Sequence, residues 1–310
     1  MSTPRIALAT AEDVWREDTD ATLTQAALDA VGVAARPAVW DDPTEDWASF
    51  DLVVVRSTWD YVPRRHEFLA WARSVEEVTE LANPAAVLRW NTDKRYLHDL
   101  GTAGVPTAPT TFLLAADLDP EDPATRGVVR AAVPDGGDVV VKPTVSAGSR
   151  DTVRHRPEHG DAAADHAIDL LAAGRDVMVQ PYLEQVDSVG ETGMVFLGGE
   201  FSHGFRKGPL LEPGGAPVSG LYAEEEISPR VPSAAEREVA GTVLAAVADR
   251  FGEDALLYAR VDVLPGPDGT PVLLELELTE PSFFLACDGG APVRMAHAFL
   301  DRARAAAARR

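Results

Sequence analysis

The sequence contains few cysteines, few lysines and no long apolar run, and each shortage excludes a class of protein. The single cysteine, Cys287, cannot form an intrachain disulfide framework, and it fits a reducing cytoplasm. No stretch approaches the ~18 apolar residues that a membrane-spanning helix needs, and the apolar run near the start is too short for a signal peptide. We therefore expect a cytoplasmic protein with no membrane partner.

Basic residues are also scarce relative to acidic ones. The chain has 28 lysines and arginines against 50 aspartates and glutamates, which gives a formal net charge of −22. A surface of this sign repels nucleic acid and anionic lipid, so neither is expected as a partner. The hydrophobic content of 45% in 310 residues is enough for a core shared between two or three domains.

Lysine is the rarer of the two basic residue types. Only Lys94, Lys142 and Lys207 occur, beside 25 arginines (28 − 3). The lysine ammonium is a compact point charge that suits a phosphate contact, whereas arginine favours planar, bidentate binding. Lysines retained in such a sequence indicate positions that need an ammonium. Chance retention on a solvated surface is the alternative for each of them.

Strands and helices alternate over roughly the first 110 residues, which predicts an α/β sheet that is parallel at least in part. The expected strands are 5–10 and 51–57, and the expected helices are 22–32, 64–78 and 91–101, the last capped by Asn91. Further along, we expect strand segments within 138–153 and 176–184, and a hairpin over 191–209 that turns at Gly198 and Gly199. The expected helices of this part are 161–173, 233–251 and 292–308. A polar connection is expected at 210–231.

The stretch "VLLELELTEPS" (272–282) has an unusual strand pattern. Three leucines alternate with Glu275, Glu277 and Thr279, so one face is apolar and the other carries two carboxylates. Like charges on one strand face repel, and this face therefore needs either solvent or a cation. The repulsion also predicts that neutralising one of its carboxylates raises stability in the absence of ligands.

The residues before this strand predict a hairpin, because two apolar runs flank "PGPDGTP". A turn centred on 268–269 places Asp262 opposite Glu275 and Arg260 opposite Glu277. Three carboxylates beside an arginine suit magnesium and phosphate oxygens. A slip of one residue would turn Asp262 away, and a solvated face with an arginine–glutamate pair is the alternative.

The pattern Arg-x-Asp, a hairpin, and then Glu-x-Glu resembles the magnesium site of the ATP-grasp superfamily, in which an asparagine usually takes the last position. The resemblance covers roughly residues 85–285 and implies ATP and Mg²⁺ as cofactors, with two ions. The implied metal ligands are Asp262, Glu275 and Glu277. Because Glu277 replaces the usual asparagine, the number or tightness of the bound ions is open.

The same resemblance assigns nucleotide contacts in chain order. They are Lys94 in "NTDKRYL", Lys142 in "VVVKP", Ser146, Gly148 and Ser149 in the phosphate-covering loop, backbone groups of Gln180, Tyr182 and Leu183 in the adenine hinge "VQPYLE", and Glu191 for the ribose. The loop has only one glycine, fewer than is usual in the superfamily.

The segments "RSTWDY", "SHGFRKGP" and "LELELTEPSFF" resemble most closely the glutathione-synthetase-like branch, which includes D-cycloserine synthetases, the O-ureido-D-serine cyclo-ligases. This implies an ATP-dependent carboxylate–amine ligase that forms an acyl phosphate and then an amide-type bond, with release of ADP and phosphate. Lys207 and Arg260 would be catalytic, neutralising charge on the transferred phosphoryl group. A phosphotransferase with a stable phosphorylated product and a non-catalytic nucleotide-binding regulator are the alternatives.

The resemblance implies the ATP-grasp fold, an α/β (α+β) architecture in which an amino-terminal open α/β domain precedes two α+β subdomains that clasp ATP. The implied domains are 1–110 on the substrate side, 111–181 with the phosphate-covering loop, and 182–310 with the adenine hinge and metal site.

An amino-acid-like small molecule is the implied substrate, either cyclised or joined to a second molecule. Ligands of open α/β sheets meet the carboxyl ends of strands, and an ammonium needs an anionic partner. The candidate substrate residues are therefore Ser57, Asp60, Glu280 and Ser282. Trp59 and Tyr61 are expected to pack beneath the 64–78 helix, and His203 is expected to be structural. A homodimer is compatible with this assignment.

Overall fold

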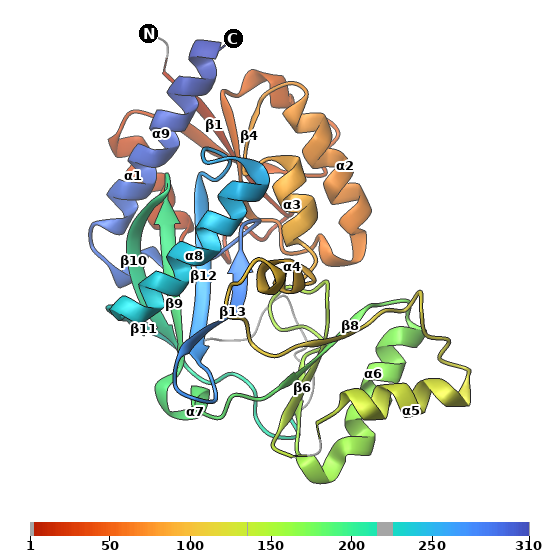
Figure 1. The fold of residues 1–310 in the computed structure, drawn as a ribbon. Helices are drawn as coiled ribbons and strands as arrows, with labels where there is room; N and C mark the ends of the chain where they lie inside the picture. Colours follow the sequence, from red (N-terminus) through yellow and green to blue (C-terminus); the bar gives the residue numbers. More distant parts are fainter. Residues whose placement is uncertain (1–2, 135, 216–225, 310) are drawn as a thin grey trace.

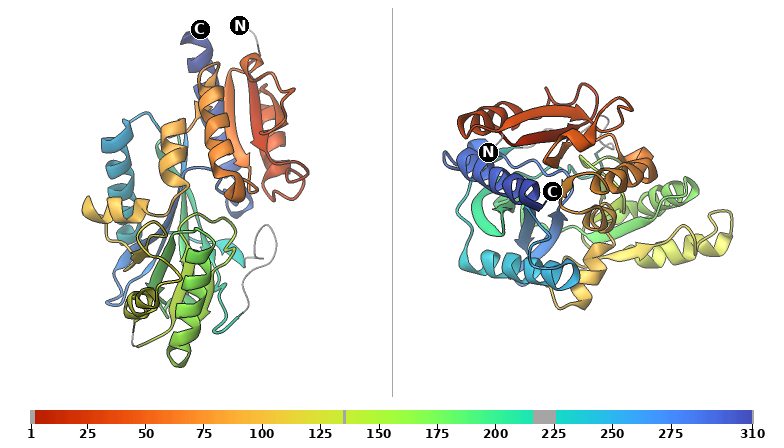
Figure 2. Two further views of the ribbon diagram at one scale, coloured as in Figure 1. Left: turned by 90° about the vertical axis from the view of Figure 1, so that its right-hand side faces the viewer. Right: turned by 90° about the horizontal axis from the view of Figure 1, so that it is seen from above.

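The computed structural model describes residues 3–134, 136–215 and 226–309, so part of the connection expected at 210–231 lies outside the described residues. The described strands form three sheets (Figure 1). Both ends of the chain lie at the same end of the molecule (Figure 2). None of the helices within the described ranges has the length and apolarity needed to cross a membrane.

The first sheet is parallel, as the strand–helix alternation predicts. Its strands are β1 (Arg5–Thr10), β2 (Ala34–Val39), β3 (Leu52–Ser57) and β4 (Glu80–Ala82), in the order β2-β1-β3-β4. The helices of this part are α1 (Ala21–Ala30), α2 (Arg65–Glu76) and α3 (Ala85–Asn91), with short 3₁₀ turns η1 (Trp47–Ser49) and η2 (Val62–Arg64). The sequence pattern missed β2, an edge strand that is largely exposed, and β4, which has only 3 residues.

The second sheet is antiparallel and carries both predicted hairpins. Its strands are β9 (Glu191–Leu197), β10 (Glu200–Lys207), β11 (Ile227–Pro229), β12 (Tyr258–Pro265) and β13 (Pro271–Glu277), in the order β11-β10-β9-β12-β13. The associated helices are α4 (Tyr96–Thr102), α7 (Val186–Val189), α8 (Ala234–Phe251) and α9 (Ala291–Arg309), with η4 (Leu285–Cys287).

The third sheet lies at the far end of the molecule from the chain termini (Figure 1). It consists of β5 (Thr111–Leu113), β6 (Val139–Pro143), β7 (Val153–His155) and β8 (Val177–Pro181), in the order β5-β8-β6-β7, all antiparallel. Its helices are α5 (Pro123–Ala132) and α6 (Gly160–Ala172), with η3 (Pro157–His159). We propose to retain the boundaries at residues 110 and 181, which leave one sheet in each part.

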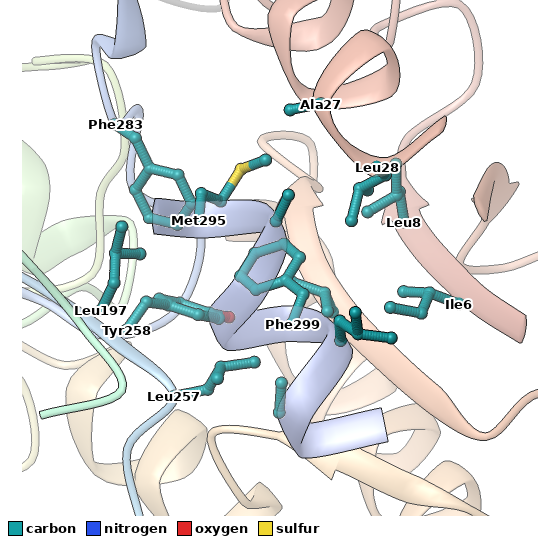
Figure 3. Close-up of a cluster of buried hydrophobic side chains, with 14 of the residues drawn as sticks. Ile6, Leu8, Ala27, Leu28, Leu197, Leu257, Tyr258, Phe283, Met295 and Phe299 are labelled. Carbon is teal, nitrogen blue, oxygen red and sulfur yellow. The ribbon is translucent and has the colours of Figure 1, made fainter. Parts of the chain in front are cut away.

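Helix α9 lies between the first two sheets and shares its apolar side chains with both (Figure 3). Met295 and Phe299 are fully buried among Leu8 of β1, Leu28 of α1 and Tyr258 of β12. Because burial of large apolar side chains is the main stabilising term in folding, this shared core fixes the first sheet against the second. The position of any site between them is therefore well determined.

The predicted register of the β12–β13 hairpin is confirmed. Arg260 pairs with Glu277 and Asp262 with Glu275, and a bulge follows Asp262. Gly269 has φ +84°, a left-handed conformation that favours glycine, and it lies in the predicted turn. The turn of the other hairpin also falls as predicted, at two glycines with positive φ.

The prediction that Asn91 caps a helix is wrong. Asn91 is the last residue of α3, and α4 begins separately at Tyr96. The Asn91 side chain instead donates to Leu276 O (2.7 Å) and accepts from Leu278 N (2.7 Å). It therefore ties the α3–α4 corner to the strand that carries the carboxylates.

Candidate active site

A cavity of about 970 Å³ lies where the three sheets approach one another. Most of the predicted site residues line it: Lys94, Lys142, Ser146, Gly148, Ser149, Gln180, Tyr182, Leu183, Glu191, Lys207, Arg260, Glu275, Glu277, Glu280 and Ser282. A volume of this size is typical of a site for a nucleotide-sized ligand. Three predicted residues lie elsewhere and are described below.

All three lysines of the chain reach the cavity, and two of them are held by acidic partners. Lys94 Nζ lies 3.2 Å from a Glu275 carboxylate oxygen and donates to the backbone O of Ser146 (2.7 Å). Lys207 Nζ lies 3.6 Å from the carboxylate of Glu191, the residue opposite it in the β9–β10 ladder. Burial lowers the pKa of Lys142, with Glu275 opposing the shift. The arrangement concentrates ammonium groups at one end of the cavity.

Arg260 organises the carboxylates of the hairpin. Its guanidinium donates to both oxygens of Asp262 (3.0 and 2.8 Å) and also to Glu277. Asp262 is fully buried behind Arg260 and is not part of the cavity wall. Lys207 Nζ lies 3.6 Å from Asp262 on the same side. The sequence predicts repulsion between the carboxylates on this face of the hairpin. In the structure, Arg260 and the lysines pair with these carboxylates and offset the repulsion.

The two glutamates of β13 differ in their ionisation. Burial opposes ionisation of Glu275, but Lys94, Lys142 and Lys207 together outweigh it and lower its pKa. For Glu277, burial is the largest effect, and together with the neighbouring carboxylates Glu275 and Asp262 it outweighs the attraction of Arg260 and raises the pKa. A divalent cation at this point would favour the ionised form of both.

The donor chemistry of this group fits Mg²⁺, which prefers carboxylate oxygens. The Glu275 and Glu277 side chains are 26% and 28% exposed, whereas that of Asp262 is 1% exposed. Within the described part of the chain, no three acidic, histidine or cysteine side chains are gathered closely enough to hold a metal ion. Of the three predicted metal ligands, Glu275 and Glu277 face the cavity. Asp262 is held by Arg260, and it reaches the cavity only if the Arg260 guanidinium moves away.

The loop between β6 and β7 covers one side of the cavity and uses left-handed backbone despite its low glycine content. Gly148, Ser149 and Asp151 have φ of +60°, +58° and +57°. Non-glycine residues adopt this conformation at a cost of roughly 1 kcal/mol or more each. The loop is anchored at its start, where the backbone N–H of Lys94 donates to Thr144 O (2.8 Å).

The segment after β8, predicted to be the adenine hinge, has fewer available backbone groups than expected. The backbone N–H of Tyr182 donates to Asp138 O (2.7 Å), so it is committed to the sheet, and Leu183 O accepts from Val186 N (3.0 Å). Gln180 is buried, and its side-chain amide donates to Thr110 Oγ1 (2.8 Å). The Tyr182 carbonyl and the Leu183 N–H therefore remain as the candidate groups for a purine edge.

Arg154 of β7 supports this hinge, and the sequence analysis missed it. Its guanidinium carbon lies 3.5 Å from the centre of the Tyr182 ring. It also pairs with Asp138 (2.6 Å) and Asp187 (3.2 Å). Such a contact combines cation–π attraction with ion pairing and fixes the ring in place. Nothing in the local pattern of β7 distinguishes Arg154 from other arginines, because its partners lie in two other segments, before β6 and after β8.

The structure does not bring Ser57 or Asp60 into the cavity. Ser57 is fully buried at the end of β3, with its Oγ 2.9 Å from Thr10 Oγ1. Asp60 accepts from Trp40 Nε1 (2.9 Å) and pairs with Arg64. Both side chains are used to hold the first sheet together, which leaves neither for a ligand.

Glu280 and Ser282 do line the cavity, and so do Trp59 and Tyr61. Tyr61 is stacked on Phe68 of α2 (4.8 Å), as its predicted packing role requires, yet its hydroxyl also interacts with Glu280. Burial raises the pKa of Glu280 to about 7, with Tyr61 opposing the shift. A cation placed beside this carboxylate would favour its ionised form.

The loop after β1 contributes Glu17, Thr19 and Asp20 to the same end of the cavity, and the sequence analysis missed all three. A signal was present, because the rule that ligands meet the carboxyl ends of parallel strands applies to β1 as well as to β3. His203 is buried, and its Nε2 lies 2.7 Å from Phe283 O, which confirms its structural role.

Comparisons with known proteins identify the family of the chain. Residues 6–83 match the family described as "D-cycloserine synthetase DcsG, N-terminal domain". The chain is 40% identical over 276 residues to "Cycloserine biosynthesis protein DcsG" of Streptomyces lavendulae, covering 88% of this chain and 90% of that protein.

Solved structures give the same result. The crystal structure of D-cycloserine synthetase DcsG superposes with a TM-score of 0.88 at 37% identity, over 96% of this chain and 99% of that one. The ATP-grasp ligase PsnB (TM-score 0.60, 21% identity, 98% and 100% coverage) and D-alanine–D-alanine ligase from Bacillus anthracis complexed with ATP (0.66, 14%, 99% and 100%) share the fold. The predicted ATP-grasp fold is confirmed.

Proposed function

The chain belongs to the D-cycloserine synthetase family of ATP-dependent ligases, and on that premise we propose that it closes an amino-acid derivative into a ring by activating its carboxylate with ATP. The observation that supports this most is the convergence of Lys94, Lys142, Lys207 and Arg260 on one cavity. Four cationic side chains gathered in a chain of net charge −22 suit the anionic phosphates of a nucleoside triphosphate.

We assign nucleotide binding to the side of the cavity formed by β6, β8 and β9. Lys94 and Lys142 would contact the phosphates, and Glu191 the ribose. Lys142, whose pKa burial lowers, would be fully charged once phosphate oxygens lie beside it. The adenine edge would meet the Tyr182 carbonyl and the Leu183 N–H. Gln180 would hold the hinge in place through the hydrogen bond from its side-chain amide to Thr110.

The loop residues Ser146, Gly148 and Ser149 would close over the phosphates. Left-handed backbone at Gly148 and Ser149 lets the loop turn tightly where it covers the cavity. Lys94 links the loop to the nucleotide, because its ammonium already donates to Ser146 O.

Magnesium would be held by Glu275 and Glu277, with Asp262 joining once Arg260 releases it, and we propose two ions. When bound, Mg²⁺ neutralises charge on the phosphate oxygens. The hairpin supplies the fixed spacing, since Asp262 and Glu275 are cross-strand partners. Glu277, in place of the usual asparagine, adds one negative charge that Arg260 balances.

The proposed reaction has two ATP-dependent steps. A substrate carboxylate oxygen attacks the γ-phosphorus, its new P–O bond replacing the bond to ADP. The nitrogen bonded to the side-chain oxygen of the same substrate then attacks the acyl carbon and gives up its proton, and phosphate leaves with the bridging oxygen. After these two ATP-dependent steps, water removes the carbamoyl group of an O-ureido substrate from the ring nitrogen as carbamic acid, which breaks down to CO₂ and ammonia. Lys207 would stabilise charge on the phosphoryl group, and Arg260 would stabilise the tetrahedral oxyanion.

The amino group of the substrate would pair with Glu280. Its pKa of about 7, raised by burial, falls when an ammonium approaches, so binding and ionisation support each other. Tyr61 orients the carboxylate through its hydroxyl. Ser282, beside Glu280 on the same wall, would contact the substrate carboxylate. This assignment replaces Asp60, which Trp40 and Arg64 occupy.

The location and the assembly of the protein are two separate proposals. The single cysteine supports a cytoplasmic enzyme. The homodimer stays a prediction.

The test is turnover of O-ureido-D-serine with ATP, followed by mass spectrometry for D-cycloserine and by assays for ADP and phosphate. A panel of amino acids, singly and in pairs, would identify an intermolecular ligase instead. Hydroxylamine should divert the acyl phosphate to a hydroxamate. A stable phosphorylated product with no hydroxamate would overturn the proposal in favour of a phosphotransferase, and nucleotide binding without ADP formation on any substrate would favour a regulator.

A further inference from the structure

The segment that follows β13, residues 278–285, forms part of the substrate end of the cavity and is here called the substrate strap. Glu280, Ser282 and Phe284 of the strap line the cavity. The strap leaves the sheet after Glu277, so its backbone polar groups must be satisfied in another way. Side chains from both neighbouring parts of the molecule do this.

One set of these side chains comes from the same part of the molecule as the strap or from the α3 corner. Its bonds are Asn91 accepting from Leu278 N (2.7 Å), Tyr258 donating to Thr279 O (2.9 Å), Arg260 donating to Ser282 O (3.3 Å) and His203 donating to Phe283 O (2.7 Å). Because a carbonyl only accepts, Nε2 of His203 must carry the proton.

The other set comes from the amino-terminal part of the chain: Arg56 lies on β3, Trp59 follows it, and Asp20 precedes α1. Trp59 Nε1 donates to Glu280 O (3.4 Å), and Arg56 donates to Pro281 O (3.0 Å). Asp20 makes the most bonds, accepting from Phe283 N (2.7 Å) and Phe284 N (3.0 Å) with one oxygen and from Leu285 N (2.8 Å) with the other. Its carboxylate therefore binds three consecutive backbone donors.

The environment of Asp20 makes these bonds strong. Asp20 is 2% exposed and Arg56 is 1% exposed. An Arg56 nitrogen lies 3.5 Å from Asp20, and the guanidinium lies 4.0 Å from the centre of the Phe283 ring. Charge-assisted bonds in a site with little water are stronger than exposed ones. The strap is thus clamped between a buried carboxylate and a buried guanidinium.

The backbone of the strap needs this clamp. Phe284 has φ +50°, a left-handed conformation that a residue of this size adopts only when its surroundings impose it. The N–H of Phe284 is one of the three that Asp20 accepts. Loss of the Asp20 bonds would let this residue relax to ordinary backbone and would move the strap.

We propose that Asp20 is a positioning residue for the amino-acid substrate: by holding the backbone of residues 283–285, it sets where Glu280 and Ser282 stand in the cavity. This rests on the proposed function, which places the substrate at those two residues. Nucleotide binding is assigned to Lys94 and Lys142, whose partners lie outside the strap. Removing the clamp should therefore affect the amino-acid substrate and spare ATP.

The test uses Asp20→Asn, which keeps the size of the side chain but turns one acceptor oxygen into an NH₂ group that faces a backbone donor. The matched control is Asp29→Asn, which removes the same charge from an exposed position on α1. We expect KM for O-ureido-D-serine to rise about tenfold or more in Asp20→Asn, since small misplacements of a substrate-binding group have large kinetic effects. KM for ATP should stay within about twofold, as should both constants in Asp29→Asn.

Equal increases in both KM values, or two unchanged values in a folded Asp20→Asn protein, would overturn the proposal. If Asp20→Asn fails to fold, Arg56→Lys, which keeps the charge but loses the bond to Pro281 O, takes its place in the same assays.

Hydrogen–deuterium exchange provides a readout that needs no substrate. The amides of Phe283, Phe284 and Leu285 should exchange slowly in the wild-type protein and much faster in Asp20→Asn, whereas Asp29→Asn should match the wild type. Fast exchange of these amides in the wild-type protein would overturn the clamp itself. If the wild-type enzyme does not turn over O-ureido-D-serine, the proposed substrate is wrong, and the exchange measurement still decides whether Asp20 holds the strap.

Discussion

Neutralising Asp262 should destabilise the protein, although the repulsion between carboxylates inferred from the sequence pattern suggested the opposite. Asp262 is 0% exposed, and both of its oxygens accept from Arg260, which is itself 4% exposed. In Asp262→Asn, the buried guanidinium loses its principal anionic partner. Breaking a buried pair by removing one member costs about 3–5 kcal/mol.

Two contacts reduce this cost. Glu277 still pairs with Arg260, and the asparagine keeps one acceptor oxygen. We therefore expect the free energy of unfolding to fall by about 2–3 kcal/mol, which corresponds to a Tm lower by roughly 3–5 °C in a chain of this size. Scanning calorimetry or circular dichroism should be used without nucleotide or magnesium, because bound ligands add stability of their own.

The matched control is Glu275→Gln on the opposite strand of the same hairpin. Its side chain is 26% exposed and pairs with Lys94 at 3.2 Å, so water can replace part of what is lost. A smaller fall in the free energy of unfolding than in Asp262→Asn is expected there. An Asp262→Asn protein as stable as the wild type, or more stable, would refute the inference that Arg260 depends on Asp262 in the absence of ligands.

Four further predictions follow from the site and the third sheet. Lys142→Ala should weaken ATP binding by about 1.5–3 kcal/mol in a protein that still folds, measured by calorimetric titration. Glu277→Asn should remain active with an altered magnesium dependence, measured as rate against Mg²⁺ concentration; an unchanged curve would remove Glu277 from the metal site. Glu280→Gln should raise KM for the amino-acid substrate strongly, whereas Asp60→Asn should not; the reverse result would restore the sequence-based assignment. Burial lowers the pKa of His155 from 6.5 to about 4, so the unfolded chain binds the extra proton between these values, and stability should fall as pH drops from about 6.5 toward 4, less so in His155→Gln.

The hairpin register was predictable because two local signals agree. The alternation of leucine and glutamate fixes which face of β13 is buried, and a turn glycine with positive φ fixes where the chain reverses. The residues that determine the register all lie within the two strands of one hairpin, so they can be recognised from a short stretch of sequence. The three lysines were predictable for a related reason, since their rarity is visible in composition alone.

The substrate end was predicted less well, because it depends on where side chains at strand ends point. Asp60 follows β3 and Glu280 follows β13, and both carboxylates suit an ammonium, yet of the two only Glu280 lines the cavity. Trp40, which donates a hydrogen bond to the Asp60 carboxylate, lies 20 residues away in the sequence. Asp20 shows the same limit, since its three partners lie more than 260 residues further along the chain.

The central claim is that a carboxylate of the substrate is activated by the γ-phosphate of ATP. It is tested most directly with O-ureido-D-serine that carries ¹⁸O in its carboxylate, turned over with unlabelled ATP in unlabelled water. The phosphate released is then examined by mass spectrometry or ³¹P NMR. The account predicts one ¹⁸O atom per phosphate, because the bridging oxygen of an acyl phosphate leaves with phosphorus. Product formation with unlabelled phosphate would contradict it.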